Sequence, residues 1–316
     1  MTILTILFHL LVFPGLLFVS VIGLLVAGID RKVYAHMQKR IGPPVTQPIY
    51  DFIKLTGKET IIPAEANRVV FLGAPVIGLI SLVILTQFIP IFGFSPLSTS
   101  SDLIVVLYLM TVPGVALMMG GSASGSPYAA IGMSREMVTM IAYELPFIMV
   151  LLTVAKKTAS VGLNFSLQNV IAWQSSNGSL ITFASIIPAA IAMLLIIPAE
   201  VGMAPFDVAE AETEICEGPL VEYSGTSLGL FKLNTALKMF IMPALFVSLF
   251  LGGLGTGVLA LDTLILLAAV IVVVLLCMTL IHAATARLKV EQLFKFYWTF
   301  VSALALASLI MAWMGL

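Results

Sequence analysis

The chain has 316 residues, of which 60% are apolar and only 10% are charged. A soluble domain carries roughly a quarter charged residues, so this composition excludes a water-soluble protein and predicts one membrane-embedded domain over residues 1–316. The net charge of −1 points to no partner by itself, and nothing in the composition suggests nucleic-acid binding.

Apolar stretches long enough to cross a bilayer recur along the whole chain. A spanning helix needs about 20 apolar residues, and a helix satisfies its own backbone in lipid. The sequence therefore predicts an all-α integral membrane protein with eight spanning helices, at residues 3–27, 69–93, 102–121, 137–155, 181–199, 228–252, 261–283 and 296–315. The first lacks the basic start and small-residue cleavage site of a signal peptide, so we expect it to be retained.

Basic residues gather in alternate connections between these helices. Of the 15 Lys and Arg, all but Lys156 and Lys157 lie in or beside the first, third, fifth and seventh connections. The positive-inside rule then places both termini outside and these four connections in the cytoplasm. We expect a multi-pass protein of a prokaryotic cytoplasmic membrane, with a charged inner face suited to docking a cytoplasmic partner.

The first connection combines a fixed turn with a short charged helix. Its candidate docking residues are Arg40, Gly42, Pro43, Pro44, Asp51, Lys54, Lys58 and Glu59. Gly-Pro-Pro cannot be helical, whereas the pattern from Pro48 onwards predicts an amphipathic helix lying at the membrane interface. The alternative is a membrane-surface anchor with no further role. The third connection, residues 120–136, carries Arg135 among small residues and is equally compatible with a flexible loop.

The segment from Pro198 to Tyr223 is the most acidic part of the chain. It contains no Lys or Arg, and its seven carboxylates are Glu200, Asp207, Glu210, Glu212, Glu214, Glu217 and Glu222. Carboxylates held this close together repel one another, which raises the proton affinity of some of them. The segment therefore predicts proton handling next to the membrane.

Turn signals at both ends predict a helix over residues 206–217 of this acidic segment. Pro205 suits a first helical turn, and Gly218 followed by Pro219 suits a stop. Such a helix places four acids on one face and Glu212 away from it, the four being Asp207, Glu210, Glu214 and Glu217. The alternative is a solvated acidic loop, although the flanking prolines and Gly202 favour a broken helix at membrane depth.

Two ionisable residues fall inside predicted spans, Glu144 in the fourth and Lys238 in the sixth. Charges at such depth are costly and mark an ion path or a paired site. Glu144 stands just before Leu145 and Pro146, where the proline frees a backbone carbonyl, so it suits a proton relay. A structural hydrogen bond to a neighbouring helix is the alternative. Glu200 is a similar candidate at the inner end of the fifth span.

The remaining reactive side chains form no recognisable site. Cys216 and Cys277 are far apart and lack the spacing of a zinc or iron–sulfur ligand set. His9 and His36 are isolated, and His282 and Arg287 are expected at the interface. No nucleotide motif or nucleophile triad occurs. We therefore expect no metal and no cofactor in this chain.

Four blocks taken together resemble the subunit 1 family of respiratory complex I. They are RIGPPVTQPIYDFIKLTGKE with IIPAEANRVVFLGAPVI, SASGSPYAAIGMSREMVTMIAYELP, APFDVAEAETEICEGPLVEYSG and ARLKVEQLFKFYW, in the family's order. The resemblance implies a subunit beneath a peripheral electron-transfer arm, beside its terminal iron–sulfur cluster. It implies a proton-relay role for Glu144, Glu200, Asp207, Glu210, Glu212, Glu214 and Glu222, and an arm-facing role for Arg135 and the Arg40 loop.

Two departures from the complex I pattern favour one branch of that family. Pro44 stands where complex I members usually have Asn, and Met203 stands where they commonly have Arg. The form resembles the branch of membrane-bound, energy-converting nickel–iron hydrogenases, which covers ferredoxin-linked hydrogenases, formate hydrogenlyases and the related sulfane sulfur reductases. This resemblance implies 4Fe-4S clusters and a NiFe centre in partner subunits, antiporter-like membrane partners, and ferredoxin as electron donor.

The sequence thus predicts an anchor and ion-coupling subunit of an energy-converting redox complex, without a redox centre of its own. Two alternatives remain open. One is a quinone-site subunit of a complex I-type oxidoreductase, and the other is a stand-alone cation transporter that uses the acids as its ion site. The terminal electron acceptor and the exported ion, H⁺ or Na⁺, stay open as well.

Overall fold

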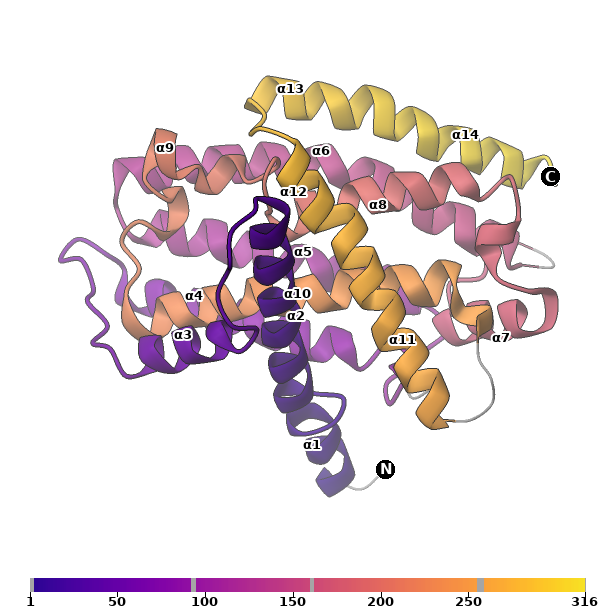
Figure 1. Ribbon diagram of the computed structural model, residues 1–316, viewed down its shortest axis with the longest axis horizontal. Helices are drawn as coiled ribbons and strands as arrows, with labels where there is room; N and C mark the ends of the chain where they lie inside the picture. Colours follow the sequence, from indigo (N-terminus) through magenta and orange to yellow (C-terminus); the bar gives the residue numbers. More distant parts are fainter. Residues whose placement is uncertain (1–2, 92–94, 160–161, 255–258, 316) are drawn as a thin grey trace.

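The computed structural model describes residues 3–91, 95–159, 162–254 and 259–315 (Figure 1). Every regular element within these ranges is helical. The α-helices are α1 (Ile3–Leu11), α2 (Leu16–Met37), α3 (Gln47–Thr56), α4 (Arg68–Thr86), α5 (Asp102–Ala123), α6 (Pro127–Lys157), α7 (Leu167–Asn177), α8 (Ile187–Val201), α9 (Glu212–Ile215), α10 (Gly225–Phe250), α11 (Leu259–Val274), α12 (Leu280–Ala284), α13 (Val290–Lys295) and α14 (Ser302–Trp313). The all-α membrane fold is confirmed.

The eight predicted spans all correspond to helices, with differences at their ends. Within the described residues, seven helices are long and apolar enough to cross a membrane, and α8 is an apolar helix of 15 residues. Pro14 separates α1 from α2, because proline interrupts the helical hydrogen bonds. The end of the second predicted span, residues 92–93, lies outside the described residues.

Two helical regions were not expected from the sequence. Helix α6 begins at Pro127, ten residues earlier than predicted, so Arg135 lies on a helix and not in a flexible loop. A proline in the first turn suits a helix start, since its missing N–H would have no partner there. Helix α7 lies in the fourth connection. The predicted short helix of the first connection is confirmed as α3, whereas its interfacial position and the orientation of the termini stay predictions.

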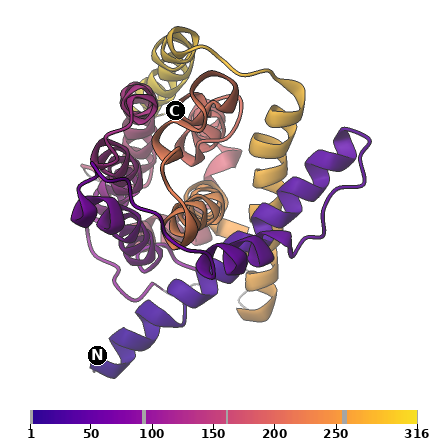
Figure 2. The same cartoon turned by 90° about the vertical axis from the view of Figure 1, so that its left-hand side faces the viewer.

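Helix α10 runs through the centre of the bundle (Figure 2). Almost every residue from Phe231 to Phe250 is buried. Helices α2, α4, α8 and α11 contact it from different sides. Figure 1 shows α3 and α9 at one end of the molecule and α7 at the other, with α2 and α11 steeply inclined to the remaining long helices. Polar side chains on the buried central helix therefore meet side chains from several others.

Prolines inside the long helices create acceptors for side chains elsewhere. Pro75 in α4 cannot donate to the carbonyl of Phe71, four residues earlier. The hydroxyl of Tyr223 donates to that carbonyl at 3.0 Å, and its ring stacks on Phe71 with centroids 4.0 Å apart. This contact fixes the end of the acidic segment against α4.

Gln174 joins α7 to the end of α10, and its loss should destabilise the protein. Its Nε2 donates to the carbonyls of Ser248 and Leu249 at 3.1 and 3.0 Å, and its Oε1 accepts from the N–H of Leu180. The side chain is fully buried. We expect Gln174→Leu to lower the free energy of unfolding by about 1–3 kcal/mol, since buried backbone groups lose their partners. Thermal unfolding in detergent measures this, with Asn169→Leu on the exposed face of α7 as control.

Candidate functional site

The acidic segment folds as three short turns and not as one helix. These are a 3₁₀ turn at Val208–Glu210, helix α9, and a 3₁₀ turn at Gly218–Leu220. Ala211 is extended, and Cys216, Glu217 and Gly218 all have positive φ. A Cβ at Gly218 would lie 2.1 Å from the carbonyl oxygen of Ala209, so the chain folds back tightly here. The predicted helix over 206–217, and the shared face of its four acids, were therefore wrong.

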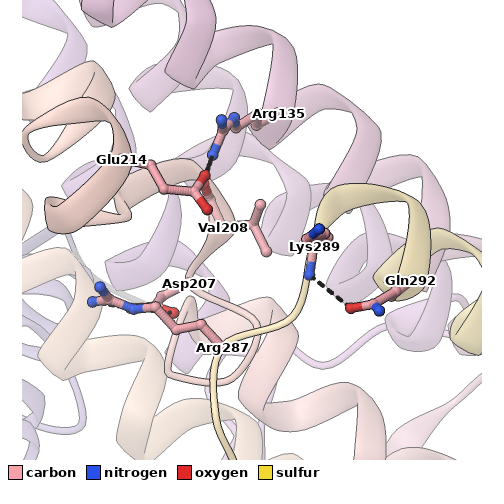
Figure 3. Close-up of polar contacts among 7 residues, drawn as sticks. All are labelled: Arg135, Asp207, Val208, Glu214, Arg287, Lys289 and Gln292. Carbon is pink, nitrogen blue, oxygen red and sulfur yellow. Dashed lines mark hydrogen bonds and ion pairs between the residues drawn. The ribbon is translucent and has the colours of Figure 1, made fainter.

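Two ion pairs tie this segment to neighbouring helices (Figure 3). Arg135 of α6 donates to the Glu214 carboxylate and, at 3.4 Å, to the carbonyl of Val208. Arg287, just before α13, pairs with Asp207 at 2.8 Å. The backbone N–H of Lys289 donates to the side-chain oxygen of Gln292 at 3.2 Å, which helps to fix the start of α13. Arg135, a predicted docking residue, thus makes contacts within the chain, and its docking role stays a prediction.

Four of the predicted relay acids lie towards the surface. Glu212 and Glu222 are exposed, and Glu217 is half-buried. Glu214 is also exposed apart from its pair with Arg135. A solvated carboxylate keeps its ordinary hydration, so these groups suit an entry surface for protons or a partner contact better than an internal relay.

The two intramembrane charges predicted from the sequence do not stand alone. Lys238 of α10 lies 3.1 Å from the Glu200 carboxylate of α8, and its Nζ also donates to the Glu200 backbone carbonyl at 2.9 Å. Both side chains are buried, with 9% and 2% of their surface exposed. Tyr143 of α6 lies close enough to interact with the same carboxylate, and Glu144 is within electrostatic range. A paired site at this depth is therefore present.

Glu136 belongs to the same group but was missed as a site residue. It lies on α6, eight residues and just over two turns before Glu144, which places the two about 80° apart around the helix. Its carboxylate is within electrostatic range of Lys238 and Glu200, and of Glu210 in the acidic segment. The spacing to Glu144 could have revealed it, had α6 been predicted to start before residue 137.

Glu210, which is half-buried at the end of the first 3₁₀ turn, lies within electrostatic range of Glu136 and Lys238. Burial, followed by the negative charges of Glu136, Asp207 and Glu217, raises its pKa to about 7, and Lys238 opposes the shift only partly. A carboxyl group with this pKa is poised to gain and lose a proton near neutral pH. The inward acids thus run from Glu210 through Glu136 to the Lys238–Glu200 pair.

Glu210→Gln should remove a pH dependence of stability. A raised pKa means that the folded chain binds more protons than the unfolded chain between about pH 4.5 and 7. The free energy of unfolding therefore falls as the pH rises through this window, on the order of 1–3 kcal/mol in total. The variant should lose that slope and be more stable than the parent at neutral pH. Unfolding temperatures across this pH range test this, with the exposed Glu212→Gln as control.

The docking residues of the first connection surround α3. Arg31 of α2 pairs with Asp51 at 3.1 Å, and Gln47 donates to the same carboxylate at 2.9 Å. Partial burial opposes ionisation of Asp51, but these hydrogen bonds and the charges of Arg31 and Lys54 prevail and lower its pKa. Gly42 has positive φ and is half-buried with Pro43. The other docking candidates are exposed, namely Arg40, Pro44, Lys54, Lys58 and Glu59.

In the part of the chain that the structure describes, no group of three or more His, Cys, Asp or Glu is arranged to hold a metal ion. The site therefore consists of carboxylates, one buried lysine and a tyrosine. Such an arrangement can hold and move protons, and a change of charge at one member alters the proton affinity of the next.

Comparison with known proteins identifies relatives over nearly the whole chain. The chain is 34% identical to NADH-quinone oxidoreductase subunit 8 of Thermus thermophilus over 306 residues, 90% of this chain and 82% of that protein. It is 32% identical to formate hydrogenlyase subunit 4 of Escherichia coli over 279 residues, 87% and 89% of the two chains. It is also 35% identical to hydrogenase-4 component C of the same organism over 228 residues, which cover 72% of this chain and 70% of that protein.

A solved structure has the same fold. A chain of the membrane-bound sulfane sulfur reductase, an archaeal respiratory membrane complex, superposes with a TM-score of 0.85 at 31% identity, covering 93% of this chain and 96% of that one. The sequence model of the family described as NADH dehydrogenase matches residues 9–313. With that match and these relatives, the chain belongs to the NADH dehydrogenase subunit 1 family.

Proposed function

We propose that this chain is the membrane anchor and ion-coupling subunit of a multisubunit, energy-converting redox complex. The observation that carries the proposal is the run of inward acids. Glu210, Glu136 and Glu200 lead from the acidic segment to the buried Lys238, and Glu144 lies within electrostatic range of Glu200. The names of the relatives support a redox complex as the setting.

The mechanism follows from how these charges influence one another. Electron transfer in a cytoplasmic module changes a charge or a loop position beside the acidic segment. Glu210, whose pKa is about 7, responds by gaining or losing a proton. The altered charge shifts the proton affinity of Glu136 and then of the Lys238–Glu200 pair and Glu144. Antiporter-like partner subunits carry the shift onwards and export H⁺ or Na⁺.

The hydrogenase-type branch fits this chain best. The turn at Gly42, Pro43 and Pro44 and the apolar Met203 differ from the complex I pattern, and relatives with hydrogenase and hydrogenlyase names span most of the chain. On this proposal the partners are hydrogenase-type large and small subunits that carry the 4Fe-4S clusters and NiFe centre, with ferredoxin as donor. The second candidate is a quinone-site subunit, favoured by the Thermus relative named as an NADH-quinone oxidoreductase subunit.

Purification of the native complex through a tag on this chain tests the branch. The complex would be assayed with reduced ferredoxin for hydrogen evolution, and in parallel for reduction of sulfane sulfur and of a quinone. Hydrogen or sulfide production without quinone reduction supports the proposed branch. Quinone reduction alone overturns it in favour of the complex I type. Ion flux by this chain alone in vesicles, with no partner retained, would identify a transporter instead.

Neutralising Glu144 or Asp207 should uncouple the complex. In Glu144→Gln or Asp207→Asn, we expect electron transfer in the peripheral module to remain measurable and ion pumping to be abolished. Each variant removes a proton-binding or charge-responding group while keeping its shape. Pumping is measured in vesicles as ions moved per electron pair, with exposed Glu65→Gln as the matched control. Ion pumping at the parent level in both variants would contradict the coupling proposal.

A further inference from the structure

A second group of polar side chains lies between α2 and the end of the α11–α12 helix, outside the acidic segment. Asp30 and Tyr34 are one turn apart on α2 and face Thr279 and His282. The Thr279 hydroxyl donates to the Asp30 carboxylate at 2.6 Å. The rings of Tyr34 and His282 stack with centroids 4.0 Å apart and planes 13° from parallel. Two helices thus meet through two adjacent polar contacts.

A π-helical turn places the second pair of side chains. The turn spans Leu275–Thr279 between α11 and α12, and it packs against α2 and α8. A π turn holds one more residue than an α turn, so it rotates the residues that follow to another side of the helix. Such turns cost helical regularity and are frequent at functional sites. Here the turn ends on Thr279, the residue that contacts Asp30.

Asp30 is a buried acid for which the described residues supply no ion-pair partner. It is 4% exposed, and its hydrogen bond comes from a neutral hydroxyl. Among the described residues, ion pairs join Arg31 to Asp51, Arg135 to Glu214, Lys238 to Glu200 and Arg287 to Asp207. A buried carboxylate without a cation is costly, so a nearby group that becomes positive would be strongly favoured.

His282 supplies such a group. It lies within electrostatic range of Asp30. Its Nδ1 is buried and has no hydrogen-bond partner among the described residues. A buried ring nitrogen without a partner either carries a lone pair that can bind a proton, or carries an N–H group that lacks an acceptor. Imidazole is the side chain that changes charge near neutral pH, and a neighbouring carboxylate favours its charged form.

The other titratable groups around this contact are already engaged. Arg31, beside Asp30 on α2, is paired with Asp51 of α3. The Cys277 thiol donates to the carbonyl of Val273 at 2.8 Å. On the remaining helices packed here, Lys238 of α10 and Glu200 of α8 are paired with each other, and Lys54 of α3 is exposed. Among the described residues, His282 is therefore the side chain near Asp30 that can become a cation and is not already in an ion pair.

We propose that Asp30 and His282 form a second proton-binding site, in which His282 takes a proton from the aqueous phase at Nδ1 and Asp30 holds the resulting imidazolium as its counter-ion. Protonation replaces an unpaired buried carboxylate by an ion pair and fastens α12 onto α2. Loss of the proton weakens that contact and leaves the Thr279 hydrogen bond. This site shares no residue with the acidic segment and does not depend on the proposed coupling function.

Infrared pH titration of the purified complex in lipid nanodiscs, with isotopically labelled histidine, tests the site. The spectrum of the parent complex minus the spectrum of the His282→Gln variant should contain a histidine signal that titrates roughly between pH 5 and 8. In Asp30→Asn, which can still accept from Thr279, that signal should move to lower pH, because the imidazolium loses its counter-ion. In Tyr34→Phe, which keeps the stacked ring, it should stay within a few tenths of a unit.

Controls separate this site from other histidines and from misfolding. His36 is an exposed histidine on α2, the helix that carries Asp30, so the His36→Gln variant should leave the signal in place. Each variant is accepted only if the complex keeps its subunit composition and unfolding temperature. An unshifted signal in Asp30→Asn overturns the pairing, and a difference spectrum without a titrating histidine overturns the site. Neither outcome bears on ion pumping by the acidic segment.

Discussion

Lys238→Met is expected to destabilise the protein by about 3–5 kcal/mol, because it leaves the Glu200 carboxylate buried without its cation. Glu200 is 3% exposed and its side chain lies 3.1 Å from the Lys238 ammonium. The loss should shrink at low pH, where Glu200 can be neutralised by a proton. The double variant Lys238→Met/Glu200→Gln should recover most of the loss, since no buried charge then remains.

Thermal and denaturant unfolding in detergent measure this effect. Lys232→Met is the matched control, because Lys232 lies on the same helix with its side chain exposed, and it should change stability by no more than about 0.5 kcal/mol. If the single and double variants are equally unstable, Lys238 acts through packing and the buried ion pair is not the cause. Recovery in the double variant would also separate the structural role of the pair from its role in coupling.

Glu136→Gln is expected to lower ion pumping by at least about tenfold while electron transfer in the peripheral module continues. Glu136 is within electrostatic range of both Glu210 and the Lys238–Glu200 pair. Its neutral isostere interrupts the run of acids without removing volume. Glu136→Asp keeps the carboxylate and should retain part of the pumping.

Vesicle assays of ions moved per electron pair decide this prediction. Exposed Glu291→Gln serves as the control for a lost carboxylate on another helix, α13. Unchanged pumping in Glu136→Gln would show that protons bypass this residue, and the proposed order of the relay would be wrong. Equal loss of pumping and of electron transfer would point instead to failed assembly.

The sequence predicted the helices well because a bilayer demands long apolar stretches. It predicted Glu144, Glu200 and Lys238 as costly charges that mark an ion path or a paired site. It could not show that Lys238 meets Glu200, since a single sequence does not specify which helices are neighbours. The acidic segment was harder. Its proline, glycine and acids are compatible with a helix, and only the tight contact of Gly218 with Ala209 shows why the chain turns back.

The residues that were missed share one cause. Glu136 precedes the predicted start of its span, and Asp30 follows the predicted end of the first. Helix ends are the least certain part of such predictions, because apolar content fades at the interface while the helix continues. Both acids lie on helices that run further than their apolar cores, α6 with 31 residues and α2 with 22.

Helix α8 has a consequence for the membrane voltage. Its 15 residues span only about 22 Å, against a hydrocarbon thickness of about 30 Å. If α8 starts near one membrane surface, its end at Val201 falls short of the other surface, and Glu200 and the start of the irregular segment then lie within the depth of the bilayer. A proton moving from Glu210 towards Glu144 then crosses part of the transmembrane field, which amounts to about 2.3 kcal/mol per charge for each 100 mV over the full thickness. A membrane potential would therefore act directly on the proton occupancy of these acids. In this way it would oppose the redox reaction that drives proton movement.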